Sequence, residues 1–174
     1  MPTPGLIWRH VTFSTLGTWL PGDPRGFRTR HHKLHSSGDH RNPPPADEHS
    51  GLHRWTQQRA ASAITFNPTQ RQIALDAMTE KTSQHHALAI AVSANHVHAL
   101  TELPTTPAET RAIVGEWKRI ASHALHHDLP GRIWARGCGL KPIADRDHQR
   151  RTFHYICRHV DEGAALWRFD QGEK

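Results

Sequence analysis

The chain is poor in cysteine and has no long apolar run. Its two cysteines, Cys138 and Cys157, are too few for a disulfide framework and form no Cys-x-x-Cys metal clip, which fits a reducing cytoplasm. No apolar stretch approaches the roughly 18 residues that a membrane-spanning helix requires. Residues Met1 to Gly5 lack the basic and apolar regions of a signal peptide. We therefore expect a cytoplasmic protein without a membrane partner.

Apolar and acidic residues are also scarce. Hydrophobic residues make up 36% of the 174 residues, and the mean hydropathy is −0.70. Lysine and arginine number 22 against 16 aspartates and glutamates, which gives a net charge of +6 and a pI near 10.0. Such a balance favours a polyanionic partner, and nucleic acid is the commonest one. A basic protein without such a partner remains the alternative that charge alone leaves open.

A polar segment rich in histidine and proline runs from about residue 28 to residue 55. It has no periodicity, so we expect one domain over residues 1–174 that carries this segment as a long loop. Its histidines match no compact zinc motif, and a solvated or DNA-contacting loop is the preferred interpretation. These histidines are His31, His32, His35, His40, His49 and His53.

Hydrophobic periodicity and turn residues predict alternating strands and helices outside that loop. The predicted strands cover residues 6–15, 86–93, 96–103 and, as a bent edge strand, 133–143. The predicted helices cover residues 67–85, 106–127 and 145–161. This order indicates an α+β fold, with an antiparallel sheet and helices mainly on one face.

The predicted strand at residue 96 begins with the sequence Asn95-His96-Val97-His98. Alternate side chains of a strand share a face, so both imidazoles project together and form half of a metal site. Tyr155 is the only tyrosine and lies on the last predicted helix. His159 follows it by four residues and would share its face, which supplies a third ligand. A hydroxyl nucleophile beside a metal ion is an arrangement for phosphoryl transfer.

Each part of this constellation also has an ordinary interpretation. A single His-x-His sequence is a weak metal motif, and a lone tyrosine on a helix commonly packs against its neighbours. The combination with a basic charge is what favours a functional site over these alternatives.

Several further segments accompany the two histidines. They are His10 to Thr15, Gly17 to Gly26, Trp117-Lys118-Arg119, Trp134 and Arg151 to Ile156. Together with Asn95 to His98, these segments resemble the HUH single-tyrosine transposases of bacterial insertion sequences, and most closely the REP-associated tyrosine transposases.

The resemblance implies a ferredoxin-like fold with the histidines on a central strand and the tyrosine on the C-terminal helix. It also implies Mg²⁺ or Mn²⁺ at the histidines and no nucleotide cofactor. Tyr155 would attack single-stranded or hairpin DNA and leave a 5′-phosphotyrosine link with a free 3′-hydroxyl. Rejoining to another 3′-end would complete strand transfer. Either a monomer or a homodimer is compatible with this chemistry, and the tyrosine could act in its own subunit or in a partner.

One position departs from that family. Its members often carry asparagine or glutamine one turn after the tyrosine, where this chain has His159, and the proline that follows there is absent. Three imidazoles favour Zn²⁺, Co²⁺ or Mn²⁺ over Mg²⁺, which prefers oxygen ligands. The identity of the metal is therefore open.

Basic residues in the second half of the chain are the candidate DNA contacts, with Trp134 as a candidate base-stacking platform. The basic candidates are Arg111, Lys118, Arg119, Arg136, Lys141, Arg151 and Arg158. Two other functions stay open. One is a non-catalytic, domesticated nucleic-acid-binding domain. The other is a metal-hydroxide phosphodiesterase, which the absence of a carboxylate after His98 disfavours.

Overall fold

The computed structural model describes residues 3–27, 34–38, 42, 44–60, 62–82 and 85–169. The chain forms two compact units, Met1–Thr15 with Thr65–Lys174, and Leu16–Ile64. The expectation of a single domain stays a prediction.

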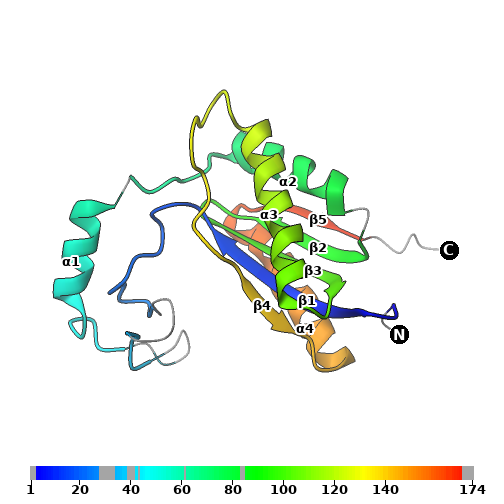
Figure 1. Ribbon diagram of the computed structural model, residues 1–174, viewed down its shortest axis with the longest axis horizontal. Helices are drawn as coiled ribbons and strands as arrows, with labels where there is room; N and C mark the ends of the chain where they lie inside the picture. Colours follow the sequence, from blue (N-terminus) through cyan, green and yellow to red (C-terminus); the bar gives the residue numbers. More distant parts are fainter. Residues whose placement is uncertain are drawn as a thin grey trace. The chain divides into compact units, whose positions relative to one another are not determined.

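The larger unit contains a five-stranded sheet (Figure 1). The strands are β1 (Leu6–Ser14), β2 (Ala87–Val92), β3 (His96–Pro104), β4 (Gly139–Pro142) and β5 (Ala165–Arg168). They lie in the order β4-β1-β3-β2-β5, and every neighbouring pair is antiparallel. With a helix after β1 and another after β3, this is the ferredoxin-like arrangement, extended by β5. The predicted α+β fold is therefore confirmed.

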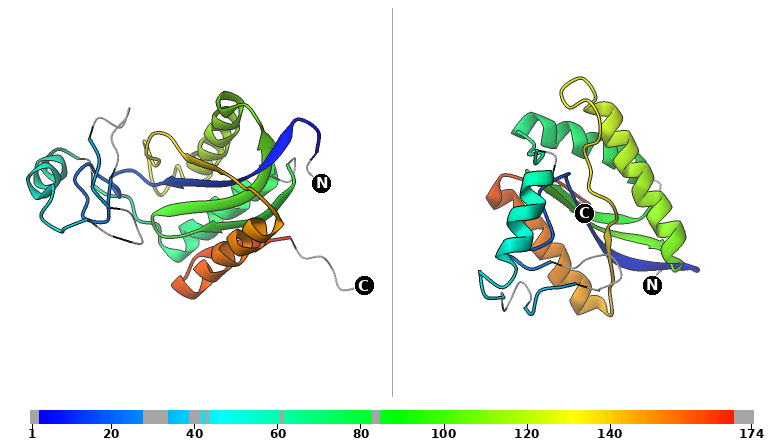
Figure 2. Two further views of the ribbon diagram at one scale, coloured as in Figure 1. Left: turned by 90° about the horizontal axis from the view of Figure 1, so that it is seen from below. Right: turned by 60° about the vertical axis from the view of Figure 1, so that its left-hand side comes forward.

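Three helices accompany the sheet in this unit: α2 (Pro68–Thr82), α3 (Pro107–Ala124) and α4 (Arg146–Cys157). The helices α2 and α3 pack against each other on one face, and α4 covers the opposite face (Figure 2). The central strand β3 is buried from Val97 to Leu103 because both of its faces are covered. Under α4, Ile156 packs into an apolar cluster with Leu100 and the alanines of β2.

Capping residues explain where two of these helices begin. At α2, Asn67 Oδ1 accepts from the Gln70 backbone, and the Asn67 N–H donates to Gln70 Oε1. At α4, Asp145 Oδ1 accepts from the His148 N–H at 2.7 Å. At α3, by contrast, the Thr106 side chain makes no capping hydrogen bond.

The C-terminal part of the fold differs from the prediction in three places. The last helix ends at Cys157 and continues as a 3₁₀ helix, η2 (Arg158–Glu162). The predicted strand over residues 133–143 contains only β4 and a bridge between Thr15 and Trp134. Strand β5 was not predicted, because four residues with intermediate or high exposure carry little periodic signal.

The smaller unit contains a helix, α1 (Ser50–Arg59), where the sequence predicted a loop extending to residue 55. The helix buries none of its residues, so it lacks the apolar stripe by which sequence reasoning finds helices. Gly22 lies near it with φ of +86°, and a Cβ there would clash with the His53 backbone nitrogen. His31, His32 and His40 lie outside the described residues.

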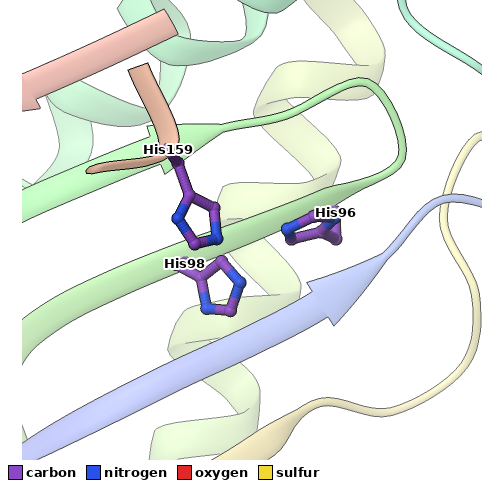
Figure 3. Close-up of side chains that lie close together, drawn as sticks. All are labelled: His96, His98 and His159. Atoms are coloured by element: carbon purple, nitrogen blue, oxygen red, sulfur yellow. The ribbon is translucent and has the colours of Figure 1, made fainter. Parts of the chain in front are cut away.

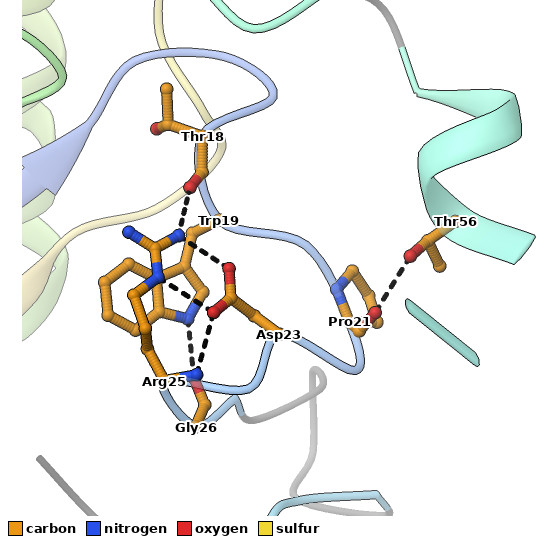
Figure 4. Close-up of polar contacts among 7 residues, drawn as sticks. All are labelled: Thr18, Trp19, Pro21, Asp23, Arg25, Gly26 and Thr56. Carbon is orange, nitrogen blue, oxygen red and sulfur yellow. Dashed lines mark hydrogen bonds and ion pairs between the residues drawn. The ribbon is translucent and has the colours of Figure 1, made fainter. Parts of the chain in front are cut away.

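A network of side chains orders the first loop of this unit (Figure 4). The Arg25 guanidinium donates to both carboxylate oxygens of Asp23 and stacks 4.4 Å from the Trp19 ring centroid. The Trp19 indole N–H donates to the Gly26 carbonyl at 2.8 Å. The pKa of Asp23 lies below its usual value although burial opposes this shift, because Arg25 donates to the carboxylate and carries a positive charge.

Candidate active site

The β2–β3 hairpin positions the first two histidines. The Ser93 N–H donates to the His96 carbonyl across the turn, and the Thr15 N–H donates to the Asn95 carbonyl at 2.9 Å. Ser14 of β1 pairs with His96, and Thr12 pairs with His98. His98 is 8% exposed, whereas His96 at the strand start is half-buried. As the alternation predicted, both rings lie on one face, with centroids 4.8 Å apart.

The third histidine lies just beyond the end of α4. His159 is buried in η2, directly after the helix, and its ring centroid lies 4.5 Å from that of His98 and 5.5 Å from that of His96. Figure 3 shows the three rings converging from β3 and η2. Within the described residues, this trio is the group of histidines, cysteines and carboxylates that could hold a metal ion, with one ligand atom of each histidine within 4.8 Å of the others.

Hydrogen bonds at Nδ1 prepare these rings as ligands. His159 Nδ1 lies 3.1 Å from the Tyr155 carbonyl, and His96 Nδ1 lies 2.7 Å from Asn95 Oδ1. Both of these oxygens accept, so each Nδ1 carries the proton and Nε2 keeps the lone pair that a metal requires. Bonds of about 2.1 Å to a tetrahedral ion put two nitrogens about 3.4 Å apart, so binding would draw the rings somewhat closer together. The donor set therefore fits an imidazole-ligated divalent ion.

His10 is a residue of this site that the sequence prediction missed. It lies on β1, and its Nε2 is 2.9 Å from His98 Nδ1, so the two rings share one proton. Their centroids lie 5.0 Å apart in a stacked arrangement. His10 thus contacts Nδ1 of His98 in the same way as the Tyr155 carbonyl contacts Nδ1 of His159. His10 belongs to the segment from His10 to Thr15 that contributes to the family resemblance. It precedes His98 by 88 positions, so no local spacing in the sequence relates the two residues.

The electrostatics of the site keep the inner imidazoles neutral. Burial, followed by the neighbouring His96, His10 and His159, lowers the pKa of His98 to about 2. Burial, followed by Lys141, His148 and His159, lowers the pKa of His10 to about 4. At neutral pH both rings are therefore uncharged, which is the form that binds a metal.

Tyr155 lies beside the cluster in the same chain. Its ring centroid is 4.9 Å from that of His159 and 5.4 Å from that of His98, and the residue is 42% exposed. Burial, followed by the charge of Glu162, raises its pKa, and Arg158 opposes this shift. The phenol is therefore protonated at neutral pH and needs a nearby cation to act as a nucleophile. The proximity expected from the sequence is observed, and the catalytic role stays a prediction.

Three of the basic candidates have exposed side chains on elements of this face or its edge. Lys141 of β4 pairs with His10 of β1, and its charge contributes to the low pKa of His10. Arg158 follows α4, and its charge acts on Tyr155. Arg151 lies on α4 itself.

The other candidates lie on α3 or on the segment before β4, and two of them have roles in the interior. Trp134 is 5% exposed and packs edge-on against Phe13 and Phe66. The residue also lines a pocket, so its role as a base-stacking platform stays a prediction. Lys118 is also engaged, because its Nζ donates to the carbonyls of Ala135 and Gly137.

The remaining three candidates are exposed arginines. Arg119 forms an ion pair with Glu116 through two hydrogen bonds, which ties its guanidinium to its own helix. Arg111 and Arg136 line a pocket beside Lys118. The structure thus divides the candidate DNA contacts between two faces of the sheet.

No described helix is both long and apolar enough to span a membrane. No protein-family model matches the chain, and no curated protein does either. Among solved structures, the chain is similar to a REP-associated tyrosine transposase bound to a REP hairpin. The two share 17% sequence identity with a TM-score of 0.48, and the similarity covers 94% of this chain and 72% of the other.

Proposed function

We propose that this chain is a metal-dependent endonuclease and strand transferase that acts on single-stranded DNA through a tyrosine nucleophile. The observation that carries the proposal is the packing of Tyr155 against two members of the three-histidine set, with ring centroids 5.4 Å from His98 and 4.9 Å from His159. A solvent-accessible phenol beside such a set is what covalent phosphoryl transfer requires. The net charge of +6 fits a nucleic-acid partner.

In the proposed reaction, Tyr155 Oη forms a bond to the scissile phosphorus, and the bond from phosphorus to the 3′-oxygen breaks. The phenol loses its proton to water, and the leaving 3′-oxygen takes up a proton from water. The products are a 5′-phosphotyrosine and a free 3′-hydroxyl. Attack by a second 3′-hydroxyl on the phosphotyrosine regenerates Tyr155 and joins the strands.

The chain's own residues prepare this step. His96, His98 and His159 would hold a divalent ion through Nε2, and that ion would polarise the phosphate and favour the phenolate. The positive charges of Lys141 and Arg158 favour the binding of phosphate next to the tyrosine. An all-imidazole set favours Mn²⁺, Co²⁺ or Zn²⁺ over Mg²⁺. Because Tyr155 adjoins the histidines of its own chain, the reaction proceeds within one subunit.

The test is a denaturing gel of the protein incubated with a DNA hairpin carrying single-stranded flanks, with Mn²⁺, Mg²⁺, Co²⁺ or Zn²⁺ added in turn. We expect a covalent protein–DNA band with the wild-type chain and none with Tyr155→Phe, which removes only the hydroxyl. His154→Ala is the matched control, because His154 is an exposed neighbour on α4 whose ring contacts Phe153. This variant should form the band normally.

The two rival functions give different results in the same assay. A metal-hydroxide phosphodiesterase would cut the DNA without a covalent band and would keep cutting after Tyr155→Phe. A non-catalytic binding domain would shift the hairpin in a native gel and cut it with none of the four metals. Either result would overturn the proposed chemistry.

A further inference from the structure

The face of the sheet away from the histidines carries a second concave site. A pocket of about 410 Å³ lies between α3 and the segment that leads into β4. Its lining combines small and apolar groups, such as Val114 and Ala135, with the four basic residues Arg111, Lys118, Arg132 and Arg136. This volume is in the range of pockets that hold a small molecule or a single nucleotide, which is roughly 300–1,000 Å³.

The charges around this pocket are not balanced. Among the described residues, no acidic side chain lines it. Arg111 and Arg136 are exposed, and within the described part of the chain their guanidiniums make no hydrogen bond or ion pair. Arg132 donates from Nε to the Trp134 carbonyl at 3.0 Å, which anchors its stem and leaves the rest of its guanidinium for a ligand. Three guanidiniums around one pocket create a site for an anion.

Lys118 and Trp134 give this pocket its fixed shape. The Lys118 ammonium donates to the Ala135 and Gly137 carbonyls, and the Trp134 indole donates back to the Lys118 carbonyl at 3.0 Å. These contacts fasten the segment before β4 to α3. The pocket wall is therefore built by hydrogen bonds of the fold, and the free arginines stand on a rigid support.

We propose that this pocket binds a phosphate-bearing nucleotide of single-stranded DNA, outside the site of cleavage. The apolar floor suits a sugar and an unstacked base, and the arginines suit the phosphate. A duplex presents its phosphates on a convex surface and keeps its bases stacked, so it cannot fill a pocket of this kind. The inference rests on the proposed function for the identity of the substrate, but it concerns DNA binding alone and does not require that the DNA be cleaved.

A short path connects the pocket to the histidine face. Cys138 lines the pocket, and β4 begins at the next residue and forms the edge of the sheet (Figure 1). Lys141, on the same strand, pairs with His10. The four residues of β4 span about 13 Å. A DNA strand that passes around this edge can therefore contact the pocket and Tyr155 at once.

The experiment measures the affinity of a fluorescent single-stranded oligonucleotide by anisotropy across a salt series, without added metal. We expect Arg111→Ala combined with Arg136→Ala to weaken binding about tenfold or more. The salt-dependence slope should also become shallower, by about 0.7 for each phosphate that the variant no longer neutralises. Lys81→Ala is the control, because Lys81 lies on α2 and its substitution removes a positive charge away from the pocket. Its binding should change less than twofold.

A second measurement uses the wild-type chain, so it is independent of how the variants fold. The two cysteines are alkylated with and without the oligonucleotide, and the modified peptides are quantified by mass spectrometry. Cys138 lines the pocket, whereas Cys157 packs against the apolar cluster under α4. We expect DNA to slow alkylation of Cys138 several-fold more than alkylation of Cys157.

The outcomes separate this inference from the proposed function. Unchanged affinity and slope in the double variant, together with unprotected Cys138, would overturn the pocket inference even if the tyrosine forms its covalent link. If protection of Cys138 comes from free deoxynucleoside monophosphate but not from the oligonucleotide, the assignment to a DNA strand is overturned. Pocket-dependent DNA binding without any covalent product would support the inference and overturn the chemistry.

Discussion

The two faces of the sheet in the larger unit differ in how exposed their polar side chains are. On the α4 face, His98 is buried and His10 is half-buried, and burial lowers the pKa of both. On the α3 face, the interior is closed by Trp134, and the charged groups Arg111 and Arg136 stand at the rim. The α4 face therefore carries neutral imidazoles in its interior, and the α3 face carries cationic guanidiniums at its surface.

This difference has a functional meaning. Metal binding requires neutral nitrogens at fixed positions, which burial and Nδ1 contacts supply. Phosphate binding requires charge that is still available to a ligand, which exposure supplies. The comparison predicts that substitutions on the α4 face alter metal affinity and chemistry, whereas substitutions at the pocket alter DNA affinity and its dependence on salt.

The largest effect is expected from His98→Ala. His98 lies at the centre of the cluster, within 4.8 Å of both other rings. Its substitution should abolish detectable covalent product and lower Mn²⁺ affinity by a hundredfold or more. Isothermal titration calorimetry of the variant, in the absence of DNA, measures the affinity. Unaltered Mn²⁺ binding would show that the histidines are not the metal site, whereas oligonucleotide binding in metal-free buffer should remain intact.

A smaller effect is expected from His10, which acts as a positioning residue through its contact with His98. His10→Ala should weaken Mn²⁺ binding about 10- to 100-fold, the usual cost of removing a group that orients a ligating histidine. His10→Gln provides an amide oxygen that can accept from His98 Nδ1, so it should restore much of the affinity. If the alanine and glutamine variants bind equally well, the contact between His10 and His98 does not orient the ligand.

The smallest effect concerns the stability of the metal-free protein at low pH. The folded-state pKa values of His10 and His98 lie below the ordinary value of 6.5, so the unfolded chain takes up protons first as the pH falls. Stability should therefore be fully present above about pH 6.5 and decline towards pH 4, by at most about 1.4 kcal/mol per pH unit for each of the two rings. Urea unfolding in chelator at several pH values measures this slope.

The matched variant for the pH prediction is His98→Gln, which removes one of the two titrating rings. Its slope between pH 6.5 and pH 4 should be shallower than that of the wild-type chain. Equal slopes would mean that other groups dominate the acid sensitivity.

The prediction from sequence succeeded best where a local pattern carries the information. The period-2 alternation placed His96 and His98 on one face, and the i, i+4 spacing brought Tyr155 beside His159. The spacing argument holds for Tyr155 and His159 even though the α-helix ends at Cys157. The 3₁₀ helix that follows keeps the same handedness, so a residue two positions beyond the helix end still lies near its last turn. The helix predicted from residue 67 also begins where expected, at Pro68, because Asn67 caps it locally.

The sequence carried least information where exposure decides the role of a residue. Trp134 and Lys118 were both predicted as nucleic-acid contacts; in the structure Trp134 is buried and Lys118 donates to two backbone carbonyls. Nothing in the neighbouring sequence distinguishes an indole that packs from one that stacks on a base. Helix α1 escaped detection because it buries no apolar face.

The sequence by itself determined the α+β class, the paired histidines, the single tyrosine and the basic charge, because each depends on composition or on spacing within one element. Only the tertiary structure decided that His10 of β1 contacts His98 of β3, and that the candidate cations divide between two faces. Such contacts depend on strand register and on which side of the sheet each helix covers. Both are set by packing between segments far apart in the chain, where one register buries the apolar residues of both faces and a shift of one residue would expose them.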